Sequence, residues 1–303
     1  MAENVELSVI LPVRDEAKNL PDLFSRLTRV LQPPISYELI LIDDGSRDRS
    51  WELIKNAAVI DPRIKALRFS RGFGHMAALT AGLDLAAGKA IVMMDADLQH
   101  PPELLPKLVE KWRAGAEIVT TVRRKNSLAS RLFYRLINLL GKLTLPDGAA
   151  DFRLLDRRAA DSLKGLREQA RFLRGLVNWL GFRQEIVEYQ APARPNGKSK
   201  YSFRKMVSFS LDAIFSFSVL PLRLAAIFGL LAAAASFIYL GYTLYIRFFT
   251  DKAIEGWASV LGALLFIGGI QLAFLGLLGE YIGRIYEEAK QRPLYIISER
   301  TGK

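Results

Sequence analysis

The sequence predicts an α/β fold, a mainly parallel sheet with helices on both faces, followed by a hairpin of two membrane-spanning helices. Residues 5–122 alternate short apolar runs with helical patterns, the rhythm of a doubly wound sheet. Nearer the C-terminus, residues 224–246 and 257–279 are two segments of 23 residues without a formal charge. As helices, each would span about 34 Å, enough for a hydrocarbon core of about 30 Å.

The elements of the sheet follow from this alternation. Short apolar runs bounded by turn residues predict strands, and the longer segments between them predict helices. We find no internal repeat and no low-complexity tract. The predicted strands cover residues 7–11, 38–42, 64–69, 90–94 and 118–122, and the predicted helices cover 20–31, 50–58, 75–86 and 102–114.

Basic residues on either side of the two uncharged segments predict their orientation. They accumulate before the first segment and after the second, whereas basic and acidic residues balance in the connection. The positive-inside rule therefore places both termini in the cytoplasm. The N-terminus lacks the basic and long apolar regions of a signal peptide, so no cleaved leader is expected. The flanking basic residues are Lys198, Lys200, Arg204, Lys205 and Arg223 before the hairpin, and Arg284, Lys290 and Arg292 after it.

The predicted domain organisation has four parts. The sheet belongs to a cytoplasmic domain, and a second amphipathic segment runs from that domain into the first span. We expect the domain over 1–202, a juxtamembrane helix over 203–218, two membrane helices at about 222–247 and 257–282 within 219–284, and a cytoplasmic tail over 285–303.

Positive charge is concentrated in one region. The formal net charge is +11, and residues 123–205 contain 19 Lys and Arg against 7 Asp and Glu. This charge suits an anionic leaflet or a phosphate-bearing substrate. No nucleic-acid-binding module is recognisable, so no nucleic-acid partner is expected. The absence of cysteine excludes disulfides and thiolate metal sites.

An amphipathic helix is predicted at about 127–144. Its polar face carries Arg131, Arg135, Asn138 and Lys142, and leucines occupy most of the other side. A helix that packs on the sheet would show the same stripe. The basic polar face and the nearby spans favour a helix that lies in the membrane interface.

Asp95-Ala96-Asp97 is the most informative motif. The two carboxylates follow an apolar strand, at the sheet edge where open α/β sheets bind ligands. Oxygen-ligated Mg²⁺ or Mn²⁺ takes one or two protein carboxylates and completes its shell with phosphates and water. In isolation, the same motif fits two solvated turn aspartates. His100 follows closely and could contact a metal or diphosphate, whereas His75, at a helix start, fits a packing or capping role.

Three further segments follow predicted strands. Carboxylates at strand ends can accept hydrogen bonds from a base or ribose, and helix N-termini favour phosphate. Each segment also fits an ordinary turn or cap. The segments are LPVRDE (11–16), DDGS (43–46) and RGFGH (71–75).

Together these segments resemble the family 2 glycosyltransferases, which have the Rossmann-like GT-A fold. The likeness is strongest to polyprenyl-phosphate glycosyltransferases, namely dolichol-phosphate mannose synthase and the bacterial membrane-anchored, GtrB-like enzymes that glycosylate undecaprenyl phosphate. Each piece is short, but they follow the expected order over nearly the whole chain. They are VILPVRDE (9–16), DDGS (43–46), DADLQHPP (95–102), DFRL (151–154), SKYS (199–202), GEYIGRIY (279–286) and RPLYII (292–297).

The resemblance implies roles for matching residues. Asp95, Asp97 and Asp151 would form the catalytic set, with Asp95 and Asp97 holding Mg²⁺ or Mn²⁺. The family often has Asn in place of Gly72 and Gly in place of Ala150; neither change removes a charged group that the chemistry needs. Residues implied for the nucleotide sugar are Pro12, Arg14, Glu16, Asp43, Asp44, Asp95, Ala96, Asp97 and Gln99. Those implied for the lipid phosphate or diphosphate are Arg123, Arg124, Arg131, Arg135, Arg153, Lys198, Lys200 and Tyr201.

The implied reaction is inverting transfer of a sugar from a UDP-sugar to undecaprenyl phosphate, on the cytoplasmic leaflet of the bacterial inner membrane, for cell-envelope glycan modification. Glucose is the default donor sugar; an aminoarabinose derivative, an N-acetylated sugar and mannose from GDP-mannose stay open. The acceptor phosphate would be mostly deprotonated at neutral pH, so Asp151 could either act as a base or orient the acceptor. The resemblance also suggests a homotetramer, with the tail at 294–297 pairing with a neighbouring subunit's sheet edge.

Two alternatives are weaker. A processive polysaccharide synthase usually has a Gln-x-x-Arg-Trp segment and more spans, and the sequence between Arg174 and Trp179 lacks that spacing. A non-catalytic membrane scaffold or flippase partner would have no reason to keep Asp44, Asp95 and Asp151 together.

Overall fold

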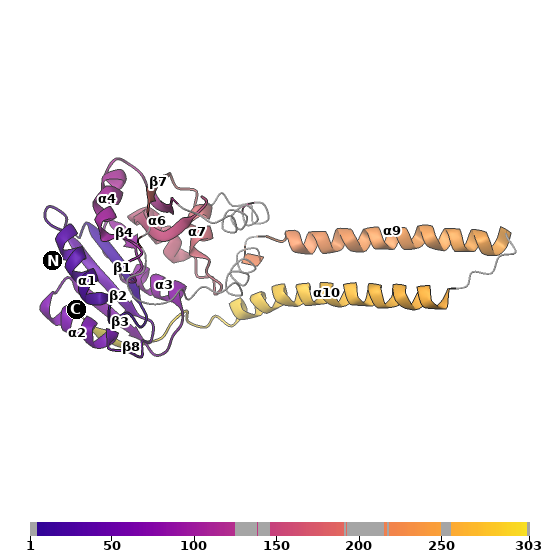
Figure 1. The fold of residues 1–303 in the computed structure, drawn as a ribbon, viewed down its shortest axis with the longest axis horizontal. Coiled ribbons are helices and arrows are strands. Elements are labelled where there is room, and N and C mark those ends of the chain that lie inside the picture. The colour runs from indigo at the N-terminus through magenta and orange to yellow at the C-terminus, as the bar shows by residue number, and fades with distance from the viewer. Residues whose placement is uncertain are drawn as a thin grey trace. The chain divides into compact units, whose positions relative to one another are not determined.

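The computed structural model describes residues 5–124, 138, 146–190, 192, 215–216, 218–249 and 256–301 (Figure 1). The chain divides into two compact units, each considered by itself. One contains Met1–Ser216 together with Arg292–Lys303, and the other contains Phe217–Gln291. The C-terminal tail therefore belongs to the same unit as the sheet.

The first unit is built on a sheet of eight strands in the order β7-β5-β6-β4-β1-β2-β3-β8, counted over the described residues. β6 and β8 are antiparallel to their neighbours, and the other pairs are parallel. The strands are β1 (Leu7–Val13), β2 (Tyr37–Asp43), β3 (Ile64–Phe69), β4 (Ala90–Met93), β5 (Ile118–Arg123), β6 (Ala149–Asp156), β7 (Gln184–Tyr189) and β8 (Ile297–Thr301). The predicted mainly parallel α/β fold is confirmed.

Helices separate the strands along the chain, and the four helices predicted over residues 20–114 are present. Their bounds differ from the predicted ones by a few residues, and the fourth begins as a 3₁₀ turn. The helices of this unit are α1 (Leu20–Val30), α2 (Ser50–Ile60), α3 (His75–Leu85), η1 (Pro102–Leu104), α4 (Leu105–Arg113), α6 (Arg157–Gly165) and α7 (Leu173–Trp179).

The central strand β1 has an apolar layer on both faces, which is why it reads as a continuous apolar run. Two successive residues of the strand illustrate this: Leu11 belongs to the core shared with α1, α2 and α4, whereas Ile10 faces α3. A Cβ at Gly82 of α3 would collide with the side chain of Ile10, so α3 lies closer to the sheet than any larger residue permits. This close packing fixes α3, whose first residue is His75.

The tail differs from its prediction. The strand begins at Ile297, not at Leu294, and it pairs antiparallel with β3 of the same chain. Pairing with a neighbouring subunit stays a prediction. Glu299 lies directly opposite Arg68 in this register. An opposite-charge pair across an antiparallel ladder favours that register, which the sequence pattern of the tail alone does not reveal.

The second unit consists of α9 (Leu220–Phe249) and α10 (Trp257–Ala289). Both are long and apolar enough to cross a membrane, with mean hydropathy of 2.1 over Leu220–Ile246 and 2.2 over Val260–Ala289. The hydroxyl of Tyr281, in α10, donates to the carbonyl of Ser218, just before α9, at 2.6 Å. This hydrogen bond joins the two helices at the end of the hairpin where α9 begins. Apart from a few isolated positions, the helices expected over 127–144 and 203–218 lie outside the described residues.

Candidate active site

The carboxyl ends of β1, β2 and β4 meet at one edge of the sheet because these strands are parallel neighbours. Arg14 follows β1, Asp43 ends β2 and Asp95 follows β4. Pro12 lies within β1, close to the same end of that strand. The predicted motifs therefore gather at the edge where open α/β sheets bind their ligands.

Asp44 is held from two sides. Its Oδ2 accepts a hydrogen bond from Nη1 of Arg14 at 2.9 Å, and its Oδ1 accepts from the backbone N–H groups of Phe73 and Gly74 at 2.6 and 3.0 Å. A Cβ at Gly72 would collide with the guanidinium of Arg14. Glycine at this position thus leaves room for the pair formed by Arg14 and Asp44.

Asp43 is completely buried and faces Arg68. Nε of Arg68 lies 3.2 Å from Oδ2 of Asp43, and the N–H of Ser46 donates to the same carboxylate. Burial raises the pKa of Asp43, because removing a carboxylate from water disfavours its charged form, while the hydrogen bonds of Ser46 and the charge of Arg68 oppose this effect. The hydrogen bonds of Ser46 and the charge of Arg68 thus both favour the ionised form of Asp43.

Glu16 has a local partner. Its Oε2 accepts from Nδ2 of Asn19 at 2.6 Å, and its backbone N–H donates to Oγ of Ser50 at 2.9 Å. These bonds connect the loop after β1 to the start of α2. A uridine-binding role for Glu16 stays a prediction.

His100 supports the Asp95–Asp97 segment through a hydrogen bond to its backbone. The N–H of Asp95 donates to Nδ1 of His100 at 2.9 Å, and the buried imidazole stacks on Phe152 with ring centroids 5.2 Å apart. Burial lowers the pKa of His100, so it is a neutral ring whose Nδ1 accepts the hydrogen bond. Oδ1 of Asp97 accepts from the N–H of Gln99 at 3.1 Å, which closes the turn after β4.

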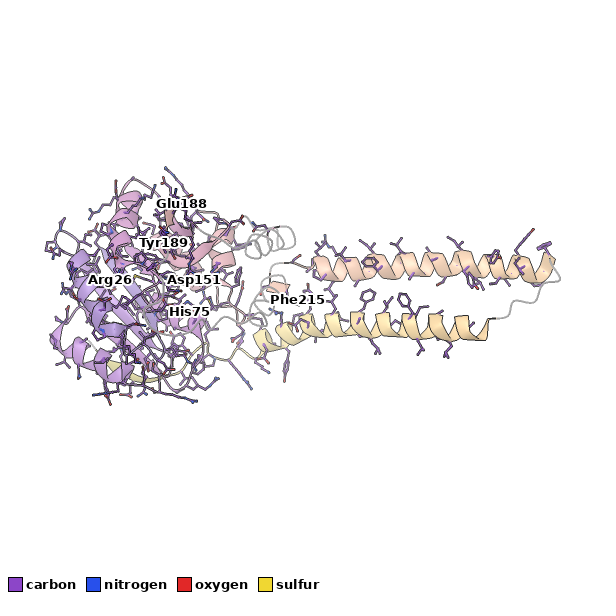
Figure 2. The ribbon with its side chains drawn as sticks, in the orientation of Figure 1. Arg26, His75, Asp151, Glu188, Tyr189 and Phe215 are labelled. Atoms are coloured by element: carbon purple, nitrogen blue, oxygen red, sulfur yellow. The ribbon has the colours of Figure 1, made fainter. Side chains whose placement is uncertain are left out.

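His75 lies between two acidic groups of the site. Its Nε2 is 3.4 Å from Oδ1 of Asp95 and 4.0 Å from Oδ2 of Asp151. His75 and Asp151 are both labelled in Figure 2. The sequence suggested only a packing or capping role for a histidine at this helix start. The structure instead places it between the carboxylate of Asp95, which follows β4, and that of Asp151, on β6.

Asp151, on β6, is bound by two arginines. Arg174 of α7 donates from Nε to Oδ1 at 2.8 Å and from Nη2 to Oδ2 at 2.7 Å, and Nη2 of Arg153 is 3.3 Å from Oδ1. Burial alone would raise the pKa of Asp151, but the charge and hydrogen bonds of Arg174, with help from Arg153, hold this pKa far below its ordinary value. Asp151 is therefore an anion at every physiological pH.

Arg174 was not among the predicted site residues. Its surrounding sequence was considered only for its lack of a synthase motif. Beside it lies a small hollow into which Arg153 also faces, and the lining residues are Thr120, Pro146, Ala149, Arg153, Arg174, Val177, Asn178 and Gln184. Two of its lining residues, Arg153 and Arg174, bind the carboxylate of Asp151, so the hollow adjoins a cluster of two positive charges and one negative charge.

Three of the residues predicted to contact the lipid phosphate or diphosphate lie in the described part of the chain. Nε of Arg123 donates to the hydroxyl of Tyr189 at 3.2 Å, Arg124 is exposed just after β5, and Nη2 of Arg153 donates to the carbonyl of Ala150 at 2.9 Å. The remaining predicted contacts, Arg131, Arg135, Lys198, Lys200 and Tyr201, lie outside the described residues.

The donor set of this edge is compatible with a divalent cation. In the part of the chain that the structure describes, no group of three or more His, Cys, Asp and Glu side chains is arranged to hold a metal alone. Asp95 and Asp97 offer carboxylate oxygens, the ligand type that Mg²⁺ and Mn²⁺ prefer. Such an ion would need further oxygens, and a bound diphosphate supplies them.

Two family models match the chain in the regions described above. The model described as glycosyl transferase family 2 matches residues 8–164, and the model described as GtrB C-terminal hairpin matches residues 220–285. The chain belongs to glycosyl transferase family 2. It is a glycosyltransferase, and the residues at the carboxyl edge of the sheet lie within the matched region.

Curated relatives extend over the full chain. An uncharacterized glycosyltransferase of Bacillus subtilis, YkcC, is 44% identical and aligns with 100% of this chain and 96% of its own length. The bactoprenol glucosyl transferase of Shigella phage SfV is 38% identical, over 99% of this chain and 100% of the relative. The match therefore includes the hairpin as well as the sheet.

Solved structures show the same fold. Glucosyl-3-phosphoglycerate synthase from Mycobacterium tuberculosis, in complex with Mn²⁺, UDP and phosphoglyceric acid, superposes with a TM-score of 0.50 and 21% identity, covering 70% of this chain and 76% of that chain. This likeness supports the GT-A fold predicted from the sequence.

Proposed function

We propose that this glycosyltransferase moves a glucosyl group from UDP-glucose to a polyprenyl phosphate, undecaprenyl phosphate in bacteria. The observation that carries the proposal is the full-length similarity to a bactoprenol glucosyl transferase, sheet and hairpin included. The strand-end carboxylates and the arginine-lined hollow beside Asp151 support this proposal, because the reaction brings together a diphosphate, a cation and a phosphate.

In this proposal the donor's uridine lies over the ends of β1 and β2. The acidic pair at the end of β2 would accept hydrogen bonds from the base and ribose, and Arg14 would adjust its contact with Asp44 as the nucleotide enters. Residues proposed to line this part are Pro12, Arg14, Glu16, Asp43 and Asp44, with Ala96 and Gln99 beside the diphosphate and sugar.

Asp95 and Asp97 are proposed to hold Mg²⁺ or Mn²⁺ together with the diphosphate. When bound, such an ion stabilises the negative charge that grows on the departing UDP. His100 keeps the strand end in place through the N–H of Asp95, and His75 lies within reach of the Asp95 carboxylate. Both histidines are therefore proposed to orient Asp95 before substrate binds.

Asp151 is proposed to orient charge instead of removing a proton. The acceptor phosphate, with a second pKa of about 6 by analogy with protein phosphates, is already mostly a dianion at neutral pH. Its oxygen attacks the anomeric carbon as the bond to the diphosphate breaks, so the configuration inverts and UDP leaves with the electron pair. No proton must move, which fits a carboxylate whose pKa Arg174 holds very low.

The acceptor phosphate is proposed to approach through the basic region. Arg153 and Arg174 line the hollow beside Asp151, and basic residues of 123–205 outside the described part would extend this surface. The hairpin is proposed to lie in the bacterial inner membrane with both termini cytoplasmic, since basic residues flank it on that side. The proposed division is a catalytic domain over 1–202, a juxtamembrane helix over 203–218, spans within 219–284 and a tail over 285–303, in a homotetramer.

The test is a transfer assay with the purified full-length protein. Undecaprenyl phosphate and Mn²⁺ are incubated with radiolabelled UDP-glucose, UDP-galactose, UDP-N-acetylglucosamine or GDP-mannose, and label in a butanol-extractable lipid is counted. We expect label from UDP-glucose at least tenfold above the others. Equal label from another donor would correct the sugar, and no lipid-linked label from any donor would contradict the proposal.

A further inference from the structure

The C-terminal strand β8 is a close neighbour of the proposed nucleotide site. β8 pairs with β3, and β3 pairs with β2, whose end supplies Asp43 and Asp44. Only residues 290–296 separate the end of α10 from the start of β8. Because β8 is antiparallel to β3, its first residue, Ile297, lies opposite Phe69 at the carboxyl end of β3, which is the sheet edge of the proposed nucleotide site.

The first connection passes through Arg68. Nη1 of Arg68 donates to Oε1 of Glu299 at 3.1 Å, while Nε of the same guanidinium lies 3.2 Å from the carboxylate of Asp43. Oε2 of Glu299 accepts from Nε1 of Trp51 at 3.0 Å, which holds the glutamate in place. One guanidinium thus joins a tail carboxylate to the buried carboxylate at the end of β2.

The charges explain why this connection matters for binding. Asp43 is fully buried, whereas the Arg68 side chain is 32% exposed and the Glu299 side chain 44% exposed. An arginine with access to water has other orientations available, and Glu299 favours the one that faces Asp43. In that orientation Nη2 of Arg68 also donates to the carbonyl of Ser46 at 3.4 Å, which supports the loop after β2.

A second connection reaches Asp44. The ring of Tyr295 stacks on Phe69 with centroids 5.1 Å apart, and Phe69 meets Phe73 edge-on at 5.6 Å. The N–H of Phe73 donates to Asp44 at 2.6 Å. Tyr295 itself is fixed by its hydroxyl, which donates to Asp84 at 2.7 Å. Both adjacent aspartates are therefore linked to the tail.

We propose that Glu299 is a positioning residue for the donor nucleotide, acting through Arg68 on Asp43, so that the C-terminal strand sets the affinity for the nucleoside diphosphate. The inference rests on the proposed function in one respect, namely that Asp43 and Asp44 contact the uridine. It adds that a residue beyond the second span candidate contributes to donor binding without touching the donor.

The experiment compares Glu299→Gln with a matched control in the full-length protein. UDP affinity in the presence of MnCl₂ is measured by titration calorimetry, and the donor KM and kcat are measured in the transfer assay. For Glu299→Gln we expect a UDP Kd and donor KM about three- to fivefold higher, as for loss of a partly exposed ion pair, with kcat within about twofold. The control is Glu185→Gln: Glu185 lies on β7 at the opposite sheet edge and accepts from Lys111 at 2.6 Å, and its loss should change neither constant.

A double-mutant cycle separates positioning from a structural effect. Arg68→Gln should weaken UDP binding more than Glu299→Gln does, and Glu299→Gln should add nothing in the Arg68→Gln background. Melting temperatures of Glu299→Gln and Glu185→Gln should agree within about 2 °C. Additive effects on Kd, or a fall of more than about 5 °C in Glu299→Gln alone, would assign Glu299 a structural role and overturn the inference.

The remaining outcomes distinguish this inference from the proposed function. If Glu299→Gln binds UDP as Glu185→Gln does while Asp44→Asn loses UDP binding, the nucleotide site is correct and the role of the tail is wrong. If the wild-type protein with MnCl₂ binds no UDP, both the proposed function and this inference are overturned.

Discussion

Arg174 and Asp151 form a two-pronged ion pair across 23 residues of sequence, with N–O distances of 2.8 and 2.7 Å. The pair joins helix α7 to strand β6 and leaves the carboxylate only slightly exposed. Paired hydrogen bonds from a planar guanidinium fix a carboxylate in both position and charge. This relationship makes Asp151 a poor proton acceptor, which the sequence alone left open.

Replacing Arg174 should change the pH dependence of transfer. Burial raises the pKa of Asp151 and Arg174 lowers it, so in Arg174→Gln that pKa rises and Asp151 takes up a proton at higher pH. The acidic limb of kcat/KM should then move to higher pH, with activity at pH 7 reduced by about tenfold or more. Arg174→Lys keeps the positive charge and should move the limb less. Identical pH profiles for the wild type and both variants would contradict this role.

The same pair should affect stability in acid. The pKa of Asp151 is lower in the folded than in the unfolded protein, so its contribution to the free energy of unfolding is present above about pH 4 and is lost as pH falls below it. Arg174→Gln should lose that pH dependence while being less stable at pH 7, because a buried carboxylate remains without its main partner. Thermal melts in steps from pH 7 down to about pH 2 measure both effects.

A side chain at position 72 should weaken donor binding without unfolding the protein. In Gly72→Ala the new Cβ displaces the guanidinium of Arg14, the far end of a flexible side chain, from Asp44. We expect the donor KM to rise about three- to fivefold, with the melting temperature within about 2 °C of the wild type. Gly165→Ala, where a Cβ meets no atom within 4 Å, is the matched control. An unchanged KM in Gly72→Ala would show that Arg14 does not act on the donor.

His100 offers a test of how the metal-binding segment is supported. His100→Phe keeps a ring for stacking on Phe152 but leaves the N–H of Asp95 without its acceptor, at a cost of about 1–3 kcal/mol. His100→Asn keeps an acceptor close to the position of Nδ1 and loses the ring. If the hydrogen bond matters more, transfer activity should survive better in His100→Asn. Higher activity in His100→Phe would assign His100 a packing role.

A single charged substitution tests whether α9 spans a membrane. Leu231 lies near the middle of α9 and is 60% exposed, so Leu231→Lys places an ammonium group inside the proposed span at a cost of about 3 kcal/mol. We expect less protein in the carbonate-washed membrane fraction. Val59→Lys, at an exposed apolar position on α2, should leave membrane recovery unchanged. Equal recovery of both variants would argue against a spanning α9.

The strands over residues 5–122 were predictable because their apolar runs are buried on both faces of the sheet. The helices were predictable because longer segments separate those runs. β6 was missed because its sequence includes Asp151 and Arg153, which look like surface residues although both are buried and paired. The positions of Asp44, Asp95 and Asp97 were predictable because each of these residues follows an apolar run that indicates a strand. Contacts such as Arg174 with Asp151 depend on tertiary packing, and no spacing in the sequence indicates them.

The location of the nucleotide and metal tests the account most directly. A cryo-electron microscopy or crystal structure of the full-length protein with UDP and MnCl₂ would show both. The account predicts Mn²⁺ coordinated by a carboxylate oxygen of Asp95 or Asp97 and by the diphosphate, with the uridine beside Asp44. Nucleotide and metal bound together elsewhere on the protein, with Asp95 and Asp97 contacting neither, would contradict it.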